Sequence, residues 1–137
     1  MKIVIDSNVI IAGLLKESIV REILVSKNNQ FFLPENALEE IEKYKSEIIE
    51  KANYTDEEYE KLISFLLKNL NLISKTETKP FIKRGEEIME KIDIKDSSFI
   101  AAALAINADG IWSFDKHFLQ QKIIKIFKTE DITKETE

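Results

Sequence analysis

Four acidic side chains lie where predicted strands end or predicted helices begin: Asp6, Glu40, Asp96 and Asp115. Open parallel sheets collect their ligand sites at the carboxyl ends of the strands, so this placement predicts that the four carboxylates converge. Two negative charges about 4 Å apart repel each other by roughly 4 kcal/mol at an effective dielectric constant of 20. A fold that gathers them therefore requires protons, basic partners or a hard cation. We favour a divalent metal ion, which would serve phosphodiester or phosphoryl chemistry.

Several of these acids also have a purely structural interpretation. Asp96 precedes two serines and an apolar helix, where it is suited to an N-cap worth about 1 kcal/mol. Asp115 is equally suited to cap a short helix that follows it. Asp6 is the hardest to explain in this way, because it abuts the apolar residues 3–5. Asp93 fits either a loop acid or an auxiliary acid of the same site.

Helical phase separates Glu40 from its neighbour Glu39. A helix is expected over residues 35–51. At about 100° per residue, Glu40 lies roughly 90° from the centre of the apolar face, whereas Glu39 lies almost opposite it. Glu40 is therefore predicted to border the interior and Glu39 to face solvent. The apolar face consists of Leu38, Ile41, Tyr44 and Ile48.

The elements that must position these acids alternate between strands and helices. Apolar runs predict strands at residues 2–5, 30–33, 72–73, 110–113 and 123–127. The remaining helices are expected at residues 8–27 (with a possible break near Lys16 and Glu17), 55–71, 81–91 and 96–107. Thr55 and Glu58 have the spacing of a capping box. The alternation predicts a single-domain, three-layer α/β/α sandwich with a central parallel sheet over residues 1–133, followed by a frayed tail at 134–137.

Composition excludes several other classes of protein. The 137 residues are 44% hydrophobic, enough for one buried core, and no apolar run approaches the ~18 residues of a membrane helix. The first strand is predicted to begin at once, which leaves no room for a signal peptide, so we expect a cytoplasmic protein without a membrane partner. Without cysteine there is no disulfide, thiolate zinc site or cysteine nucleophile. The net charge of −5 argues against binding nucleic acid by bulk electrostatics alone.

The order and spacing of the motifs resemble the PIN-domain family, which includes single-domain ribonucleases and the VapC-type toxins of toxin–antitoxin pairs. The resemblance covers nearly the whole chain. The motifs that carry it are residues 3–8 (IVIDSN), 34 with 37–41 (P, ALEEI), 93 with 96–103 (D, DSSFIAAA) and 110–118 (GIWSFDKHF).

The resemblance implies a metal-dependent ribonuclease that uses Mg²⁺ or Mn²⁺ to hydrolyse RNA. Its acidic catalytic and metal-binding site would correspond to Asp6, Glu40, Asp96 and Asp115, with Asn8 and Ser113 orienting these carboxylates or the backbone. Asp93 matches an extra acid found in some members. His117 stands where the family often has another acid, and we expect it on the surface rather than as a metal ligand. A homodimer and an antitoxin partner are also implied.

Three alternative functions are weighed against this one. A haloacid-dehalogenase-like phosphatase would need a second aspartate two residues after Asp6, where this chain has Asn8. A receiver-like phosphoacceptor would need a lysine after a later strand, and no good match is present. A non-catalytic interaction module of the same fold remains the main competitor. The helix from Thr55 is apolar over more than one stripe, so it is either buried on two sides or available to a partner.

Overall fold

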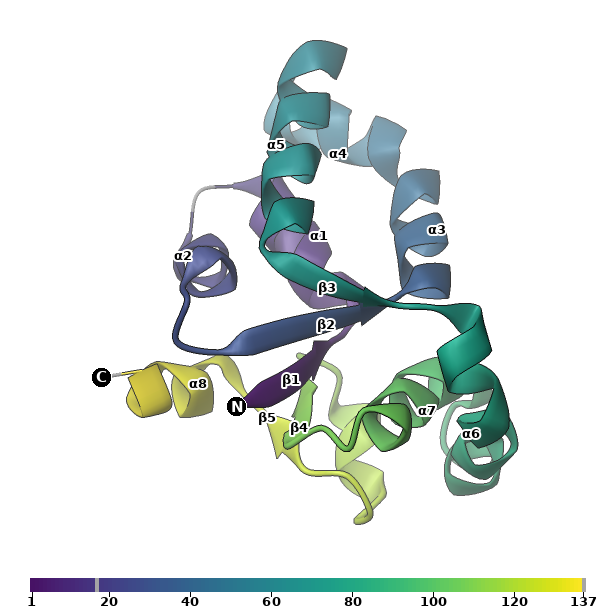
Figure 1. The fold of residues 1–137 in the computed structure, drawn as a ribbon. Coiled ribbons are helices and arrows are strands. Elements are labelled where there is room, and N and C mark those ends of the chain that lie inside the picture. Colours follow the sequence, from purple (N-terminus) through teal and green to yellow (C-terminus); the bar gives the residue numbers. More distant parts are fainter. Residues whose placement is uncertain (17, 137) are drawn as a thin grey trace.

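The computed structural model describes residues 1–16 and 18–136, and these form a parallel sheet covered by helices (Figure 1). The five strands are β1 (Lys2–Ile5), β2 (Gln30–Pro34), β3 (Leu70–Ile73), β4 (Gly110–Trp112) and β5 (Ile126–Phe127). Their spatial order is β3-β2-β1-β4-β5, and every pairing is parallel. The predicted three-layer α/β/α architecture is therefore confirmed. The chain order reverses direction at β1, so β1 and β4 lie side by side at the point where such sheets bind ligands.

Helices connect the strands on both faces of the sheet. Right-handed crossovers place the helices before β3 on one face and the helices between β3 and β4 on the other (Figure 1). The helices are α1 (Ser7–Leu15), α2 (Ile19–Val25), α3 (Glu35–Lys43), α4 (Lys45–Ala52), α5 (Asp56–Lys68), α6 (Lys75–Met89), α7 (Ser97–Ala105) and α8 (Thr129–Thr136). Two short 3₁₀ helices precede α7 and follow β4: η1 (Ile94–Asp96) and η2 (Lys116–Gln120).

The core lies between the sheet and these helices. All three apolar residues of β1 after Lys2 are fully buried, as expected for a central strand covered on both faces. Trp112 on β4 is also fully buried, and its ring lies 5.8 Å from that of Phe31 on β2. Within the described ranges, no helix is long and apolar enough to cross a membrane.

Two of the predicted helices are each divided in the structure. The predicted helix 8–27 ends at Leu15 and resumes at Ile19, because Lys16 adopts an extended backbone conformation. The break was expected near Lys16, and its second residue, Glu17, lies outside the described residues. The helix predicted over 35–51 is divided at Tyr44, whose side chain is 40% exposed. Counting Tyr44 among the core residues was therefore wrong.

Other differences concern where helices and strands begin and end, and one additional helix. The expected capping box at Thr55 and Glu58 is present. A second one at Ser74 and Glu77 starts α6 six residues before the predicted start, and Pro80 lies inside that helix. The predicted strand 123–127 shortens to β5, because the side chain of Gln121 bonds the backbone of Phe118, Ile123 and Ile124 and holds this segment as a loop. Helix α8 was not predicted.

The proposed boundary at residue 133 stays a prediction. The described backbone is helical through Thr136, and Glu137 lies outside the described residues.

Candidate functional site

The site begins where β1 and β4 end side by side. Asp6 follows β1 and is only 4% exposed. Its backbone N–H donates to the carbonyl of Trp112 at 3.0 Å, which continues the pairing of the two strands. Its carboxylate accepts a hydrogen bond from the hydroxyl of Ser113, the first residue after β4, at 2.7 Å. Sheet register therefore fixes the carboxylate of Asp6 against Ser113.

Ser113 also positions Asp115. The Ser113 hydroxyl oxygen accepts a hydrogen bond from the backbone N–H of Asp115 at 2.9 Å. Asp115 in turn accepts from the backbone N–H of His117 at 2.9 Å and so caps η2. The structural interpretation of Asp115 as a cap is thus correct, and the cap uses one of its two carboxylate oxygens. The same hydroxyl therefore links the end of β1 to the start of η2.

The two neighbouring glutamates of α3 point to different partners. Glu40 accepts a hydrogen bond at 3.2 Å from the hydroxyl of Ser7, which directly follows Asp6 and is itself buried. Glu39 instead forms an exposed ion pair with Lys75 at 2.6 Å. Glu40 is exposed to solvent, yet its carboxylate is directed to the end of β1. Both residues are exposed, so the prediction that Glu40 borders the interior was wrong in burial, although the two side chains point to different partners, as the helical phase predicts.

Asp96 lies at the start of α7 but does not cap it. Its side chain makes no capping hydrogen bond, and its Oδ2 atom is buried without a hydrogen-bond partner in the described part of the chain. The cap of η1 is provided by Asp93, which accepts from the backbone N–H of Lys95 at 3.1 Å. The capping interpretation of Asp96 is therefore wrong, and its placement has no structural explanation of that kind.

Asp93, Asp96 and His117 form a cluster of possible ligands. One ligand atom from each of the three lies within 4.8 Å of the others. The Nδ1 atom of His117 is 3.5 Å from a carboxylate oxygen of Asp115 and 3.8 Å from one of Asp93. The imidazole is 54% exposed, as expected from sequence, but it also borders the acidic site.

The electrostatics of the site connect the four predicted acids. Burial raises the pKa of Asp6; the hydrogen bond from Ser113 lowers it, and the charges of Asp115 and Glu40 raise it further. Burial is also the main reason why the pKa of Asp96 rises to about 7, and the charges of Asp6, Asp93 and Asp115 add to that effect. The charge of His117 acts in the opposite direction. The charges of Asp6 and Asp115 thus act on Asp96, whereas that of Glu40 acts on Asp6. Within the described ranges, the group of ligand atoms that lie within 4.8 Å of one another includes only Asp96 of the four predicted acids.

The donor set fits a hard or borderline divalent cation. Carboxylates suit Mg²⁺, and carboxylates with an imidazole suit Mn²⁺ and related metals. A cation-binding site without its cation is expected to have raised carboxylate pKa values and unpaired polar atoms. Here the pKa values of Asp6 and Asp96 are raised, and the buried Oδ2 atom of Asp96 has no hydrogen-bond partner among the described residues.

Two residues that contact the site were not predicted from the sequence to do so: Ser7 was not considered, and His117 was expected on the surface rather than as a metal ligand. Ser7 had a usable signal, because a hydroxyl residue directly after a strand-ending aspartate must lie in the first turn of the next helix. The proximity of His117 to Asp93 depends on how η2 lies against η1, for which the sequence carries no signal. Asn8, which was singled out, is exposed in the first turn of α1, and no hydrogen bond of its side chain is found within the described ranges.

Comparison with known proteins identifies the family. A PIN-domain family model matches residues 4–137, nearly the whole chain. The chain belongs to the PIN-domain family. A chain in the crystal structure of VapBC2 from Rickettsia felis bound to a DNA fragment from their promoter is similar to this PIN domain, with a TM-score of 0.72 and 17% identity. The match covers 93% of this chain and 98% of that chain, and at this identity it shows the shared fold. No curated protein matches.

Proposed function

We propose that this PIN-domain protein is a metal-dependent endoribonuclease that hydrolyses RNA phosphodiester bonds in the cytoplasm. Membership of the family supports nuclease chemistry in general. The observation that carries the proposal is the buried Oδ2 atom of Asp96, which has no hydrogen-bond partner among the described residues. Buried polar atoms are nearly always paired, and a bound cation would provide the missing partner.

We assign metal binding and catalysis to Asp6, Glu40, Asp96 and Asp115, with Asp93 as an auxiliary ligand. When bound, Mg²⁺ or Mn²⁺ would lower the pKa of a water molecule and neutralise charge on the phosphate under attack. The protein's own contribution is to hold the carboxylates in place. Ser113 holds the carboxylate of Asp6 and the backbone of Asp115, and Ser7 holds Glu40. In this assignment Asn8 orients the neighbouring carboxylates or the backbone beside Asp6.

Imidazole nitrogen is a better ligand for Mn²⁺ than for Mg²⁺. The position of His117 beside Asp93 and Asp96 therefore favours Mn²⁺ as the more effective ion in this chain.

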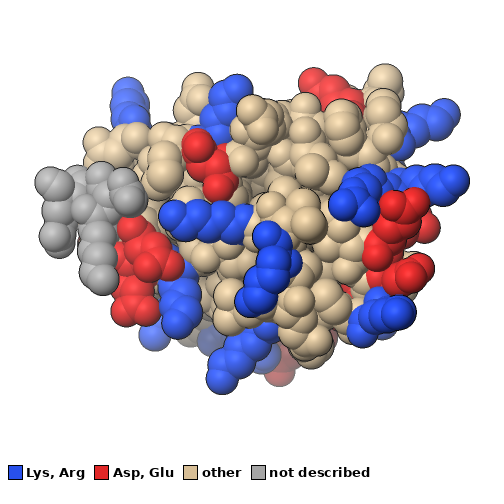
Figure 2. Space-filling view, turned by 90° about the horizontal axis from the view of Figure 1, so that it is seen from below, with Lys and Arg blue, Asp and Glu red and all other residues tan. Residues whose placement is uncertain are grey.

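RNA binding is proposed to depend on the site rather than on overall charge. The net charge is −5. On the side of the molecule that faces down in Figure 1, lysines and arginines are spread among acidic side chains and do not form one continuous track (Figure 2). An RNA strand would therefore be held mainly where a cation and nearby lysines offset the acidic charge.

We further propose that the protein is the toxin of a toxin–antitoxin pair and forms a homodimer. The fold shared with a chain of the VapBC2 complex supports a protein partner. Helix α5 buries Tyr59, Ile63 and Leu66, whereas Phe65 is 50% exposed. Leu72 on the neighbouring edge strand β3 is 47% exposed. One apolar side of helix α5 is thus buried and another is exposed to solvent. An exposed apolar side is the arrangement expected of a contact surface.

The proposal is tested by RNA hydrolysis with a matched pair of variants. The wild-type protein should cleave single-stranded RNA in millimolar Mn²⁺ or Mg²⁺, lose activity in EDTA and leave small phosphate monoesters intact. Asp6→Asn should lose most of the cleavage activity. Asp109→Asn should keep it, because Asp109 precedes β4 at the amino end of the strands, opposite the carboxyl end where Asp6 lies, and accepts a hydrogen bond there from the backbone N–H of Lys2.

Trapping experiments separate this chemistry from the alternatives. A phosphatase of the haloacid-dehalogenase type would form an aspartyl phosphate on Asp6, detectable with beryllium fluoride or with acid-quenched labelled phosphate. A labelled Asp6 would refute the nuclease proposal. A protein that neither acquires label nor cleaves several RNAs with either metal would instead be a non-catalytic interaction module.

A further inference from the structure

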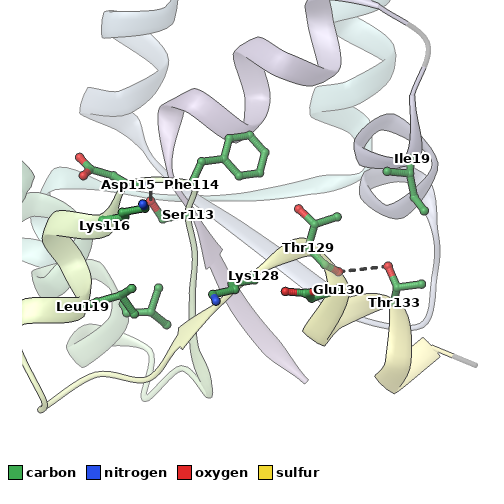
Figure 3. A pocket seen from close by; sticks show the side chains of 11 residues that line it. Ile19, Ser113, Phe114, Asp115, Lys116, Leu119, Lys128, Thr129, Glu130 and Thr133 are labelled. Carbon is green, nitrogen blue, oxygen red and sulfur yellow. Dashed lines mark hydrogen bonds between the residues drawn. The ribbon is translucent and has the colours of Figure 1, made fainter.

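A hollow of about 820 Å³ adjoins the acidic site on the far side of the segment that follows β4 (Figure 3). This is within the usual range for small-molecule sites. One wall is the segment from Ser113 to Leu119, and the other is formed by β5 and the start of α8. Ile19 at the start of α2 closes one end.

The hollow and the acidic site share two residues, Ser113 and Asp115. Phe114 lies between them in the chain, and its side chain points away from that of Asp115 (Figure 3). Its backbone is fixed on both sides: the N–H of Ser113 donates to the carbonyl of Phe127 at 3.3 Å, and that of Asp115 donates to the Ser113 hydroxyl. The segment that positions the catalytic carboxylate therefore also positions the ring of Phe114.

The side chains of the hollow combine an aromatic ring with positive charge. Phe114 is 47% exposed, although it is a large apolar residue next to a polar site. Lys116 and Lys128 also line the hollow, and in the described part of the chain neither forms an ion pair. Asp115 and Glu130 are the two acidic residues of the lining. An exposed ring with adjacent lysines is the combination that binds single-stranded nucleic acid, by stacking on a base and neutralising its phosphate.

We infer that this hollow binds the nucleotide next to the scissile phosphate, with its base against Phe114 and its phosphate near Lys116 and Lys128. The inference rests on the proposed function, because continuity with the acidic site is what selects an RNA strand over a protein segment. When an RNA strand binds with its scissile phosphate at the carboxylates, the next nucleotide must lie on one of the two sides of residues 113–115. The side that contains Phe114 offers a cavity, a ring and two lysines for which the described residues provide no ion-pair partner.

The inference is tested by binding of a short, fluorescein-labelled single-stranded RNA, followed by fluorescence anisotropy in Mn²⁺. All variants carry Asp6→Asn, so that the RNA stays intact. Phe114→Ala should weaken binding about fivefold to a hundredfold, the range expected for the loss of one base–aromatic stack. Phe114→Tyr keeps the ring and should bind as the parent protein does. Ile123→Ala is the control, because Ile123 is 57% exposed but does not line the hollow.

A second measurement tests the lysines separately from the ring. Replacing Lys128 with Gln should reduce the slope of log affinity against log salt concentration by about 0.7, the value for one phosphate contact on a single strand. Unchanged RNA affinity in Phe114→Ala would overturn the inference. The hollow would then be a contact surface for a protein partner instead. A parent protein that does not bind RNA would overturn it as well. If binding depends on Phe114 but the protein with Asp6 intact never cleaves RNA, the nuclease proposal fails and the nucleotide site is retained.

Discussion

The raised pKa of Asp96 predicts that this residue destabilises the metal-free protein at neutral and alkaline pH. The ordinary pKa is 3.8 and the folded-state pKa is about 7, so the folded protein holds the proton more tightly than the unfolded chain. The contribution of Asp96 to stability is therefore most favourable below about pH 4. It is lost as the pH rises from about 4 to 7, and above pH 7 the full unfavourable difference is present.

The size of this effect follows from the same values. A difference of about three pKa units corresponds to about 4 kcal/mol. Asp96 is partly exposed, and solvent screening reduces the expected figure to about 2–3 kcal/mol. Asp96→Asn removes the charge and places an amide donor next to the other carboxylates. In EDTA at pH 8 this variant should be more stable than the wild type by that amount, and its melting temperature should be higher by on the order of 10 °C.

Urea unfolding in EDTA, measured at several pH values between 4 and 8, tests this reasoning. The stabilising effect of Asp96→Asn should be small at pH 4 and should grow until about pH 7. Glu86→Gln, an exposed carboxylate on α6, should show no such trend. Millimolar Mn²⁺ should raise the melting temperature of the wild type and have much less effect on Asp96→Asn. A variant that is no more stable than the wild type at pH 8, or that responds equally to Mn²⁺, would refute the assignment of Asp96 to a metal site.

Two further predictions concern the elements around the site. Glu40→Gln should reduce metal-dependent RNA cleavage by about tenfold or more, whereas Glu39→Gln should leave the rate near that of the wild type, because Glu39 pairs with Lys75 and not with Ser7. The reverse order of effects in a steady-state cleavage assay would mean that the wrong glutamate is assigned. Gly85→Ala should lower the free energy of unfolding by about 1–3 kcal/mol, because the added Cβ would lie 2.5 Å from the backbone oxygen of Ser97. A thermal denaturation curve that does not shift would show that α6 and α7 can separate without cost.

The sheet and the order of the acids could be predicted because buried parallel strands have a simple pattern. Residues 3–5 form an uninterrupted apolar run that ends at Asp6, and such a run indicates a strand covered on both faces. The capping box at Thr55 was equally readable, since both of its hydrogen bonds are local. Local chemistry and burial on two faces are properties that a single sequence expresses directly.

The features that were not predicted depend on individual side-chain contacts and on packing, which no periodic pattern in the sequence expresses. The division at Tyr44 exposes a residue that helical periodicity places in the core. The short length of β5 depends on the side chain of Gln121, which donates two hydrogen bonds to nearby backbone carbonyls and accepts two from nearby backbone N–H groups. The cluster of Asp93, Asp96 and His117 requires η1 and η2 to lie against each other, and no periodic pattern carries that information.

The capping and ligand interpretations of these acids need not exclude each other. A cap or a hydroxyl contact occupies one carboxylate oxygen, and a carboxylate has two. Asp115 Oδ1 caps η2, Asp93 Oδ1 caps η1 and Glu40 Oε2 accepts from Ser7. Each hydrogen bond fixes its carboxylate while leaving a second oxygen that can bind a cation. Among these acids, Asp96 alone has no such contact in the described part of the chain, and it is the acid whose pKa is raised to about 7. The local hydrogen bonds thus orient the surrounding acids near Asp96, the one carboxylate of this group for which the described residues provide no hydrogen-bond partner.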